Sequence, residues 1–99
     1  MGRYHRSRPA RLAEKLLQIR NSLGLSQNAM IRRLGLEVEI SQSRISGYEL
    51  ATREPTLLIL LRYAQVAGVC VDVLIDDRLS LPARLPGTPK HTRSLKSSY

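Results

Sequence analysis

Signals that end one helix and begin the next recur at short intervals along the chain. Three stretches of helical apolar periodicity are each followed by a glycine, which readily takes the left-handed conformation at a helix end: Gly24, Gly35 and Gly68. Residues suited to capping a helix N-terminus each stand before a further helical stretch: Ser26, Ser41 and Thr56. These signals predict five short helices, at residues 10–21, 27–34, 42–50, 57–67 and 71–76. Only LEVEI alternates as a strand would, so we predict an all-α fold.

The excess positive charge lies in the two ends of the chain. The 99 residues carry a formal charge of +8. Residues 1–11 and 79–99 each hold four basic residues and no acid, whereas residues 12–78 hold eight of each sign. We therefore expect a basic arm at residues 1–9, a helical domain at 10–78 and a flexible, basic, disordered tail beyond it. Such ends suit a polyanionic partner, although basic tails can also serve solubility alone.

Composition and motif content disfavour several function classes. The single cysteine, Cys70, cannot form an internal disulfide, and we expect it to be a small core residue. The longest apolar run, residues 57–61, is too short to cross a bilayer, and residues 1–11 lack the apolar stretch of a signal peptide. We find no nucleophile–base motif, paired carboxylates or metal cluster, so we expect no enzyme, cofactor or metal. These features predict a soluble, cytoplasmic protein without membrane contact.

Two neighbouring predicted helices carry the features of a DNA-reading pair. In a helix-turn-helix, the first helix crosses the phosphate backbone and the second enters the major groove. Ser26 and Gln27 begin the first helix, where free backbone N–H groups favour phosphate. The second helix offers polar side chains early on its outer face: Gln42, Ser43, Arg44 and Ser46. Glutamine can pair with adenine and arginine with guanine, although the same side chains alone would also suit a solvated helix face.

Three stretches follow one another along the chain: IRNSLGLSQ, ISQSRISGYE and REPTLLILLRYAQVAGVCVDVL. In this order they resemble the phage-repressor and Cro-like (Xre-type) helix-turn-helix domains, over residues 12–76. The resemblance implies a compact five-helix, lambda-repressor-like domain. It also implies a sequence-specific regulator of transcription that binds double-stranded DNA, and a repressor acting as a homodimer is the role we expect.

The resemblance also implies roles for individual residues. Gln27 would touch phosphate and buttress Gln42, the first residue of the recognition helix, and Arg53 would contact the phosphate backbone. Arg20 and Glu49 would form an internal ion pair, since a buried carboxylate without a cation would be costly. Together with Ser26 at the helix N-terminus, the predicted DNA contacts are Gln27, Gln42, Ser43, Arg44, Ser46 and Arg53.

An insert departs from the family pattern between the second and third helices. Residues 36–40 (LEVEI) make this connection several residues longer than is usual. Their alternation predicts that Leu36 and Ile40 face inward. Glu37 and Glu39 would then face solvent and point away from DNA, because acids oppose phosphate binding. The insert could shift the recognition helix, which leaves the individual base contacts open.

Two small residues also depart from the pattern in the recognition helix. Gly47 stands where many relatives carry a long side chain, so a possible DNA contact is lost. Ala51 stands where glycine is common, so we expect the end of the helix to be less sharply capped.

The predicted fourth helix carries more apolar residues than one inward stripe requires. The expected stripe is Leu57, Leu60, Leu61 and Ala64. Apolar residues outside it, with one from the fifth helix, form a candidate partner surface: Leu58, Ile59, Val66 and Val73. This surface suits a homodimer, or alternatively an antitoxin or adaptor protein whose patch and C-terminal tail bind another protein. The tail could instead fold back and cover the patch through Leu79, Leu81 and Leu85.

Overall fold

The computed structural model describes residues 8–87. This part of the chain contains five helices joined by short loops. They are α1 (Leu12–Leu23), α2 (Gln27–Leu34), α3 (Gln42–Glu49), α4 (Leu57–Ala67) and α5 (Val71–Ile75). No β-strand occurs within this range, and the predicted all-α fold with five helices is confirmed. Most of the predicted N-terminal arm and the second half of the predicted tail lie outside the described residues.

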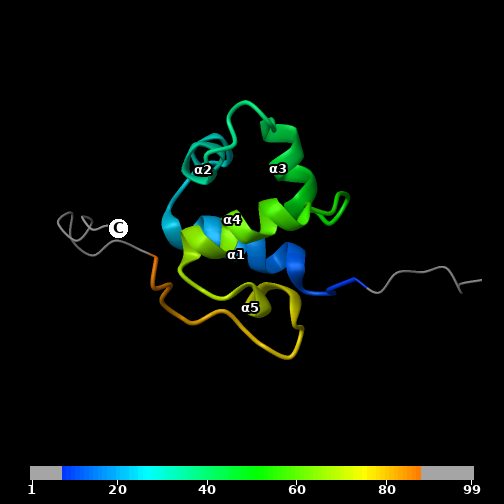
Figure 1. Ribbon diagram of the computed structural model, residues 1–99, viewed down its shortest axis with the longest axis vertical. Helices are drawn as coiled ribbons and strands as arrows, with labels where there is room; N and C mark the ends of the chain where they lie inside the picture. Colours follow the sequence, from blue (N-terminus) through cyan, green and yellow to red (C-terminus); the bar gives the residue numbers. More distant parts are fainter. Residues whose placement is uncertain (1–7, 88–99) are drawn as a thin grey trace, which may run out of the picture.

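The helices are arranged around α1 and α4, which contact each other in the middle of the domain (Figure 1). The pair α2 and α3 lies at one end, and α5 lies at the other. Helix α1 packs against α3 and α5, while α4 packs against α2 and α5. The α2–α3 pair is thus supported from behind by α1 and α4, and the first residues of α3 remain exposed.

Local signals place the ends of α2 and α4 where the sequence predicts them, while α1 begins and ends two residues later than predicted. Ser26 and Thr56 each accept a hydrogen bond from the backbone N–H three residues later, over 3.0 and 3.3 Å. Each of the three glycines adopts a positive φ at a helix C-terminus: Gly24, Gly35 and Gly68. Ser41 occupies the N-cap position of α3, but its hydroxyl pairs with Ser43 Oγ at 3.0 Å rather than with a backbone N–H.

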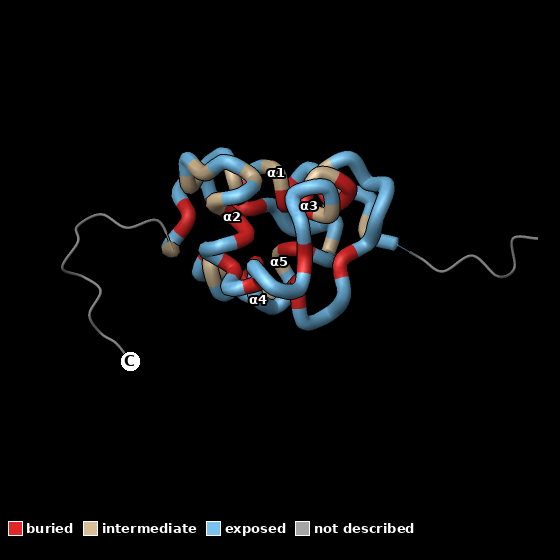
Figure 2. The backbone as a smooth tube through the Cα atoms, turned by 90° about the horizontal axis from the view of Figure 1, so that it is seen from above, coloured by how far each residue is buried: buried red, intermediate tan, exposed pale blue. Residues whose placement is uncertain are grey.

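The apolar core draws on every helix, and buried positions lie on all five (Figure 2). On α4 the buried residues are Ile59, Leu60, Tyr63, Ala64 and Ala67. The predicted inward stripe is therefore wrong at Leu57 and Leu61, which are exposed. Because α1, α2 and α5 all contact α4, the buried face of α4 is broad, and it includes Ile59 and Tyr63.

Most of the candidate partner surface is not exposed, because the other helices cover this side of α4. Ile59 belongs to the core, and Val66 and Val73 are half-buried against it. Of the four predicted residues only Leu58 is well exposed, at 73%. Cys70 is also exposed, at the N-cap position of α5, so the expectation of a core residue is wrong.

The chain continues to pack against the helices after residue 78. We call residues 79–87 the C-terminal strap. Leu81 and Leu85 of the strap are buried in the common core, and the backbone N–H of Gly87 donates to Ala67 O at 2.9 Å. A Cβ on Gly87 would collide with the carbonyl oxygen of Val66, so the two backbones approach very closely. The packed unit thus extends beyond the expected boundary at residue 78. This part of the tail folds back through Leu81 and Leu85, but Leu79 is exposed and Leu58 of the candidate partner surface stays uncovered.

Two polar contacts fasten α1 to the end of α5. The Asp77 carboxylate accepts the backbone N–H groups of Ala10 (2.8 Å) and Arg11 (3.0 Å), and these bonds hold the pKa of Asp77 below its usual value. Lys15 is completely buried, and its Nζ donates to two carbonyl oxygens at the end of α5 over 2.7 and 3.1 Å. Burial lowers the pKa of Lys15. Sequence patterns gave no sign of either contact, because the partners lie far apart along the chain.

Helix α3 ends in a Schellman motif whose left-handed residue is an alanine. The N–H of Thr52 donates to Gly47 O at 2.9 Å, and that of Ala51 donates to Tyr48 O at 3.4 Å. Ala51 has a φ of 63°, which costs an L-residue about 1–2 kcal/mol. The expectation of a weakly capped end is therefore wrong, because the motif is complete. The alanine in place of glycine strains the backbone at this position instead.

Replacing Ala51 with glycine should raise the free energy of unfolding by about 0.5–1 kcal/mol. Glycine loses more backbone entropy on folding, by about 0.5–1 kcal/mol, but it removes the larger left-handed strain. For a domain of this size, thermal unfolding should then shift upward by several degrees, at roughly 4–8 °C per kcal/mol. Ala13→Gly in the first turn of α1 is the control and should lower the melting temperature. A lower melting temperature for Ala51→Gly would contradict the strain.

Candidate nucleic-acid interface

The start of α2 offers backbone N–H groups to an anion. Ser26 is exposed, and its hydroxyl caps the N–H of Ala29, one of the N–H groups that a helix N-terminus leaves without intrahelical partners. The partial positive charge of a helix N-terminus favours phosphate there. No acidic residue lies in the first turn of α2 to oppose this.

A buried ion pair joins α1 to α3. Arg20 donates to Glu49 through Nε at 2.7 Å and through Nη2 at 3.0 Å, and its Nη1 donates to Leu25 O at 2.9 Å. The Glu49 side chain is 4% exposed and that of Arg20 is 16% exposed. The hydrogen bond to Glu49 raises the pKa of Arg20. The ion pair implied by the family resemblance is therefore present, and it fixes the end of α3 against the end of α1.

The same carboxylate begins a chain of hydrogen bonds that reaches the first residue of α3. Gln27 donates from Nε2 to Glu49 Oε1 at 3.1 Å. Gln42 in turn donates from Nε2 to Gln27 Oε1 at 3.0 Å. Gln27 therefore links the buried pair to Gln42, which is exposed, and it buttresses Gln42 as the resemblance implies.

The bond to Gln27 leaves the Gln42 amide able to read a base. A glutamine amide has two N–H donors and one carbonyl acceptor, and the bond to Gln27 uses one donor. One donor and the acceptor remain, which is the pair that adenine N7 and N6 require. The network thus orients the amide while preserving its hydrogen-bonding capacity.

The other polar residues predicted on α3 lie in different surroundings. Ser43 is exposed next to Gln42, while Ser46 is half-buried one turn further along. Arg44 is half-buried and lines a groove that the insert and the first turn of α4 also border. Ile45 is fully buried, as predicted. Gln42 and Ser43 therefore share one open face, and Arg44 lies on the flank toward α4.

The insert forms a compact turn and leaves α3 in contact with α2. Leu36 and Ile40 are buried and Glu37 and Glu39 are exposed, as the alternation predicts. The segment is not extended, however: Leu36 O accepts the N–H groups of residues 39 and 40, and Val38 at the tip is 94% exposed. Because the insert forms a closed turn, it does not separate α3 from α2, and the side chains of Gln42 and Gln27 are hydrogen-bonded.

Arg62 supports the α2–α3 pair from α4. Its Nη1 donates to Leu34 O at 2.6 Å, at the C-terminus of α2 where the helix leaves carbonyls without partners. No pattern in the sequence indicated this contact. A basic residue near C-terminal carbonyls is a known stabilising arrangement, but only the tertiary structure brings α4 to this helix end.

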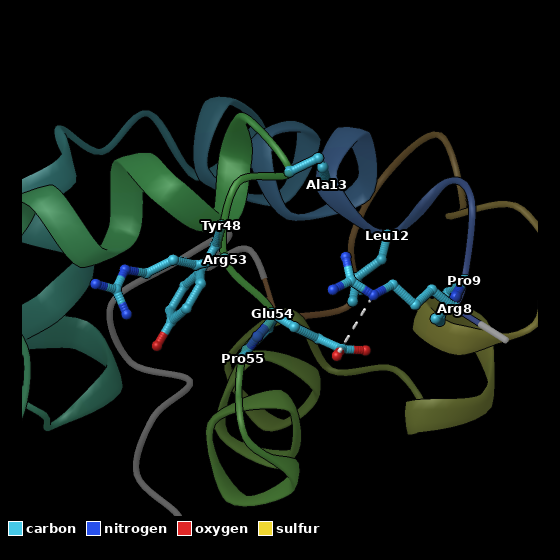
Figure 3. A pocket seen from close by; sticks show the side chains of 9 residues that line it. Arg8, Pro9, Leu12, Ala13, Tyr48, Arg53, Glu54 and Pro55 are labelled. Carbon is cyan, nitrogen blue, oxygen red and sulfur yellow. Dashed lines mark ion pairs between the residues drawn. The ribbon is translucent and has the colours of Figure 1, made fainter. Parts of the chain in front are cut away.

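Arg53 and the start of the N-terminal segment border one small hollow after α3 (Figure 3). Arg8 Nε lies 3.8 Å from Glu54 Oε1, so the N-terminal segment passes beside the loop that follows α3. Arg53 is exposed, and its side chain extends away from Glu54 (Figure 3).

Comparison with protein-family models matches residues 16–74, more than half of the chain, to the helix-turn-helix model. The chain belongs to the Cro/C1-type helix-turn-helix family. It is therefore a DNA-binding regulator by family, and α2 and α3 form its helix-turn-helix. Neither the curated proteins nor the solved structures gave a match. Within residues 8–87, no helix of this Cro/C1-type domain is long and apolar enough to span a membrane.

Proposed function

We propose that this Cro/C1-type protein represses transcription by binding a specific duplex DNA site with α3 in the major groove. The bond between Gln27 and Gln42 carries the proposal. It holds an exposed amide at the start of α3 in one orientation and leaves it the donor and acceptor that adenine requires. Preorganisation of this kind favours binding, because less side-chain freedom is lost in the complex.

Neighbouring groups supply the supporting contacts in this proposal. The N-terminus of α2, with Ser26 and Gln27, binds a phosphate on one side of the groove. Ser43, with Arg44 or Ser46, adds contacts from α3, and Arg53 adds one from the loop beyond it. The basic residues near both chain ends strengthen binding to any duplex and make it depend on salt.

We also propose that the protein acts in the cytoplasm as a homodimer that occludes a promoter. Three leucines are exposed on one side of α4: Leu57, Leu58 and Leu61. An apolar group of this kind supports an interface, and two-fold pairing would present two recognition helices to a symmetric site. The same leucines would suit a different protein, as an antitoxin or adaptor requires, so the mass of the protein–DNA complex is the relevant observation.

Gln42→Ala should weaken the preference for the specific site at one base pair. Selection from random duplexes identifies the preferred sequence, and titrations at several salt concentrations compare it with a scrambled duplex. A specific regulator binds its site about 1000-fold or more tightly than other DNA. Loss of the Gln42 amide should remove roughly tenfold or more of that ratio at one A·T pair. The salt slope should stay the same, because no charge is lost.

Gln18→Ala, which removes an exposed amide from α1, is the matched control and should leave the preference unchanged. If the wild type binds all duplexes alike and Gln42→Ala has no effect, the proposal of a sequence-specific repressor fails. Light scattering of the complex then tests the dimer separately, with a second copy expected on each symmetric site.

A further inference from the structure

Gly47 leaves a notch in α3 that the side chain of Arg53 fills. Gly47 is buried, although it has no side chain of its own. A Cβ built on Gly47 would lie 3.2 Å from Cβ, 3.1 Å from Cγ and 3.3 Å from Cδ of Arg53. The stem of Arg53 therefore rests directly on the bare backbone of α3.

The Schellman motif at the end of α3 brings Arg53 into this position. The N–H groups of Thr52 and Arg53 both donate to Gly47 O, at 2.9 and 3.2 Å. The chain is thus folded back over the last turn of α3. Figure 3 shows the Arg53 side chain running away from Glu54, which instead faces Arg8.

The position of the notch directs Arg53 to the reading face of α3. Gly47 follows Ser43 by four residues, so the two lie on the same face, one turn apart. Ser43 is exposed on that face beside Gln42. Within residues 8–87, the Arg53 guanidinium makes no hydrogen bond or ion pair, so its donors remain free. The arginine of the ion pair, Arg20, by contrast donates to Glu49 and to Leu25 O.

We propose that Arg53 reads a guanine in the major groove and takes the place of the side chain that Gly47 lacks. This inference rests on the proposed sequence-specific DNA binding. The guanidinium can donate two parallel hydrogen bonds to guanine O6 and N7. A stem packed on Gly47 limits the motion of the side chain before binding, which a phosphate contact would not require. A methyl group at Gly47 would force the Arg53 stem to move by a few tenths of an ångström, which shifts the guanidinium out of line with the two acceptors of guanine.

The test compares base preferences of the wild type, Arg53→Ala and Gly47→Ala, selected from random duplexes at fixed salt. We expect both variants to lose preference for guanine at the same base pair, by roughly tenfold or more. Gly47→Ala retains the charge of Arg53, so its affinity for scrambled DNA should equal that of the wild type. Arg33→Ala, which removes an exposed arginine at the end of α2, is the control and should change no base preference.

Two results would overturn the role of Arg53. Arg53→Ala could weaken preferred and scrambled duplexes equally and lower the salt slope by about one, which identifies a phosphate contact. Alternatively, Gly47→Ala could keep the full guanine preference, which would show that the packed stem has no part in reading. In either case Gln42→Ala would still abolish the preference at its own base pair. A wild type without any preferred sequence is a different outcome, since it removes the proposed function itself.

Discussion

Glu49→Ala is expected to lower the free energy of unfolding by about 3–5 kcal/mol. The change leaves the Arg20 guanidinium partly buried without its carboxylate and removes the acceptor for Gln27. An uncompensated charge at such a site is costly, because water cannot fully replace the lost partner. A natural domain is stable by only about 5–15 kcal/mol, so the loss is a large part of the total. Urea unfolding followed by circular dichroism measures it as a lower midpoint.

Glu14→Ala is the matched control for the loss of a carboxylate. Glu14 pairs with Arg11 at 3.2 Å, but its side chain is 62% exposed, and surface pairs contribute about 0–1 kcal/mol. We expect its midpoint to lie close to that of the wild type. Equal midpoints for Glu49→Ala and Glu14→Ala would show that the Arg20–Glu49 pair does not hold α1 to α3.

The helix ends could be predicted from the sequence because each depends on a few neighbouring residues. Ser26 and Thr56 cap helices that begin at the next residue, as predicted. Gly35 and Gly68 end α2 and α4 where a left-handed residue is needed. Such local signals do not depend on the rest of the fold, so the bounds of α2 and α4 match the prediction.

Burial around α4 could not be predicted in the same way. Apolar residues occur on all sides of this helix, and its sequence does not state which side meets α1, α2 and α5. The predicted stripe is rotated relative to the structure, since it places Leu57 inside and Ile59 outside. The buried Lys15 and the capping Asp77 escape prediction because their bonds join residues far apart in the chain.

The candidate site contains both features that could be predicted and features that could not. The family resemblance implied the links from Arg20 to Glu49 and from Gln27 to Gln42, and the structure confirms their geometry. The packing of Arg53 on Gly47 could not be foreseen, because it depends on a left-handed alanine that turns the chain back. Which of these residues contact DNA stays a prediction, which the base-preference measurements on their variants test.

Removal of the C-terminal strap should destabilise the domain by about 3–6 kcal/mol. A chain ending at residue 78 loses the buried side chains of Leu81 and Leu85, and full burial of a leucine contributes about 1.5–3 kcal/mol. It also loses the bonds from Arg11 to Leu79 O (3.1 Å) and to Ser80 Oγ (3.2 Å). Urea unfolding of this chain and of one ending at residue 87 isolates the strap, because only residues 79–87 differ between them.

Single substitutions locate the effect within the strap. Leu85→Ala should cost about 2–5 kcal/mol, since Leu85 is only 2% exposed and its removal leaves a cavity. Leu79→Ala is the control and should cost much less, because Leu79 is 40% exposed. Identical unfolding midpoints for chains ending at residues 78 and 87 would show that the helices alone supply the stability. A lower midpoint for the shorter chain and for Leu85→Ala would instead make the strap part of the folded domain, so any deletion designed to test the basic tail must begin after Gly87.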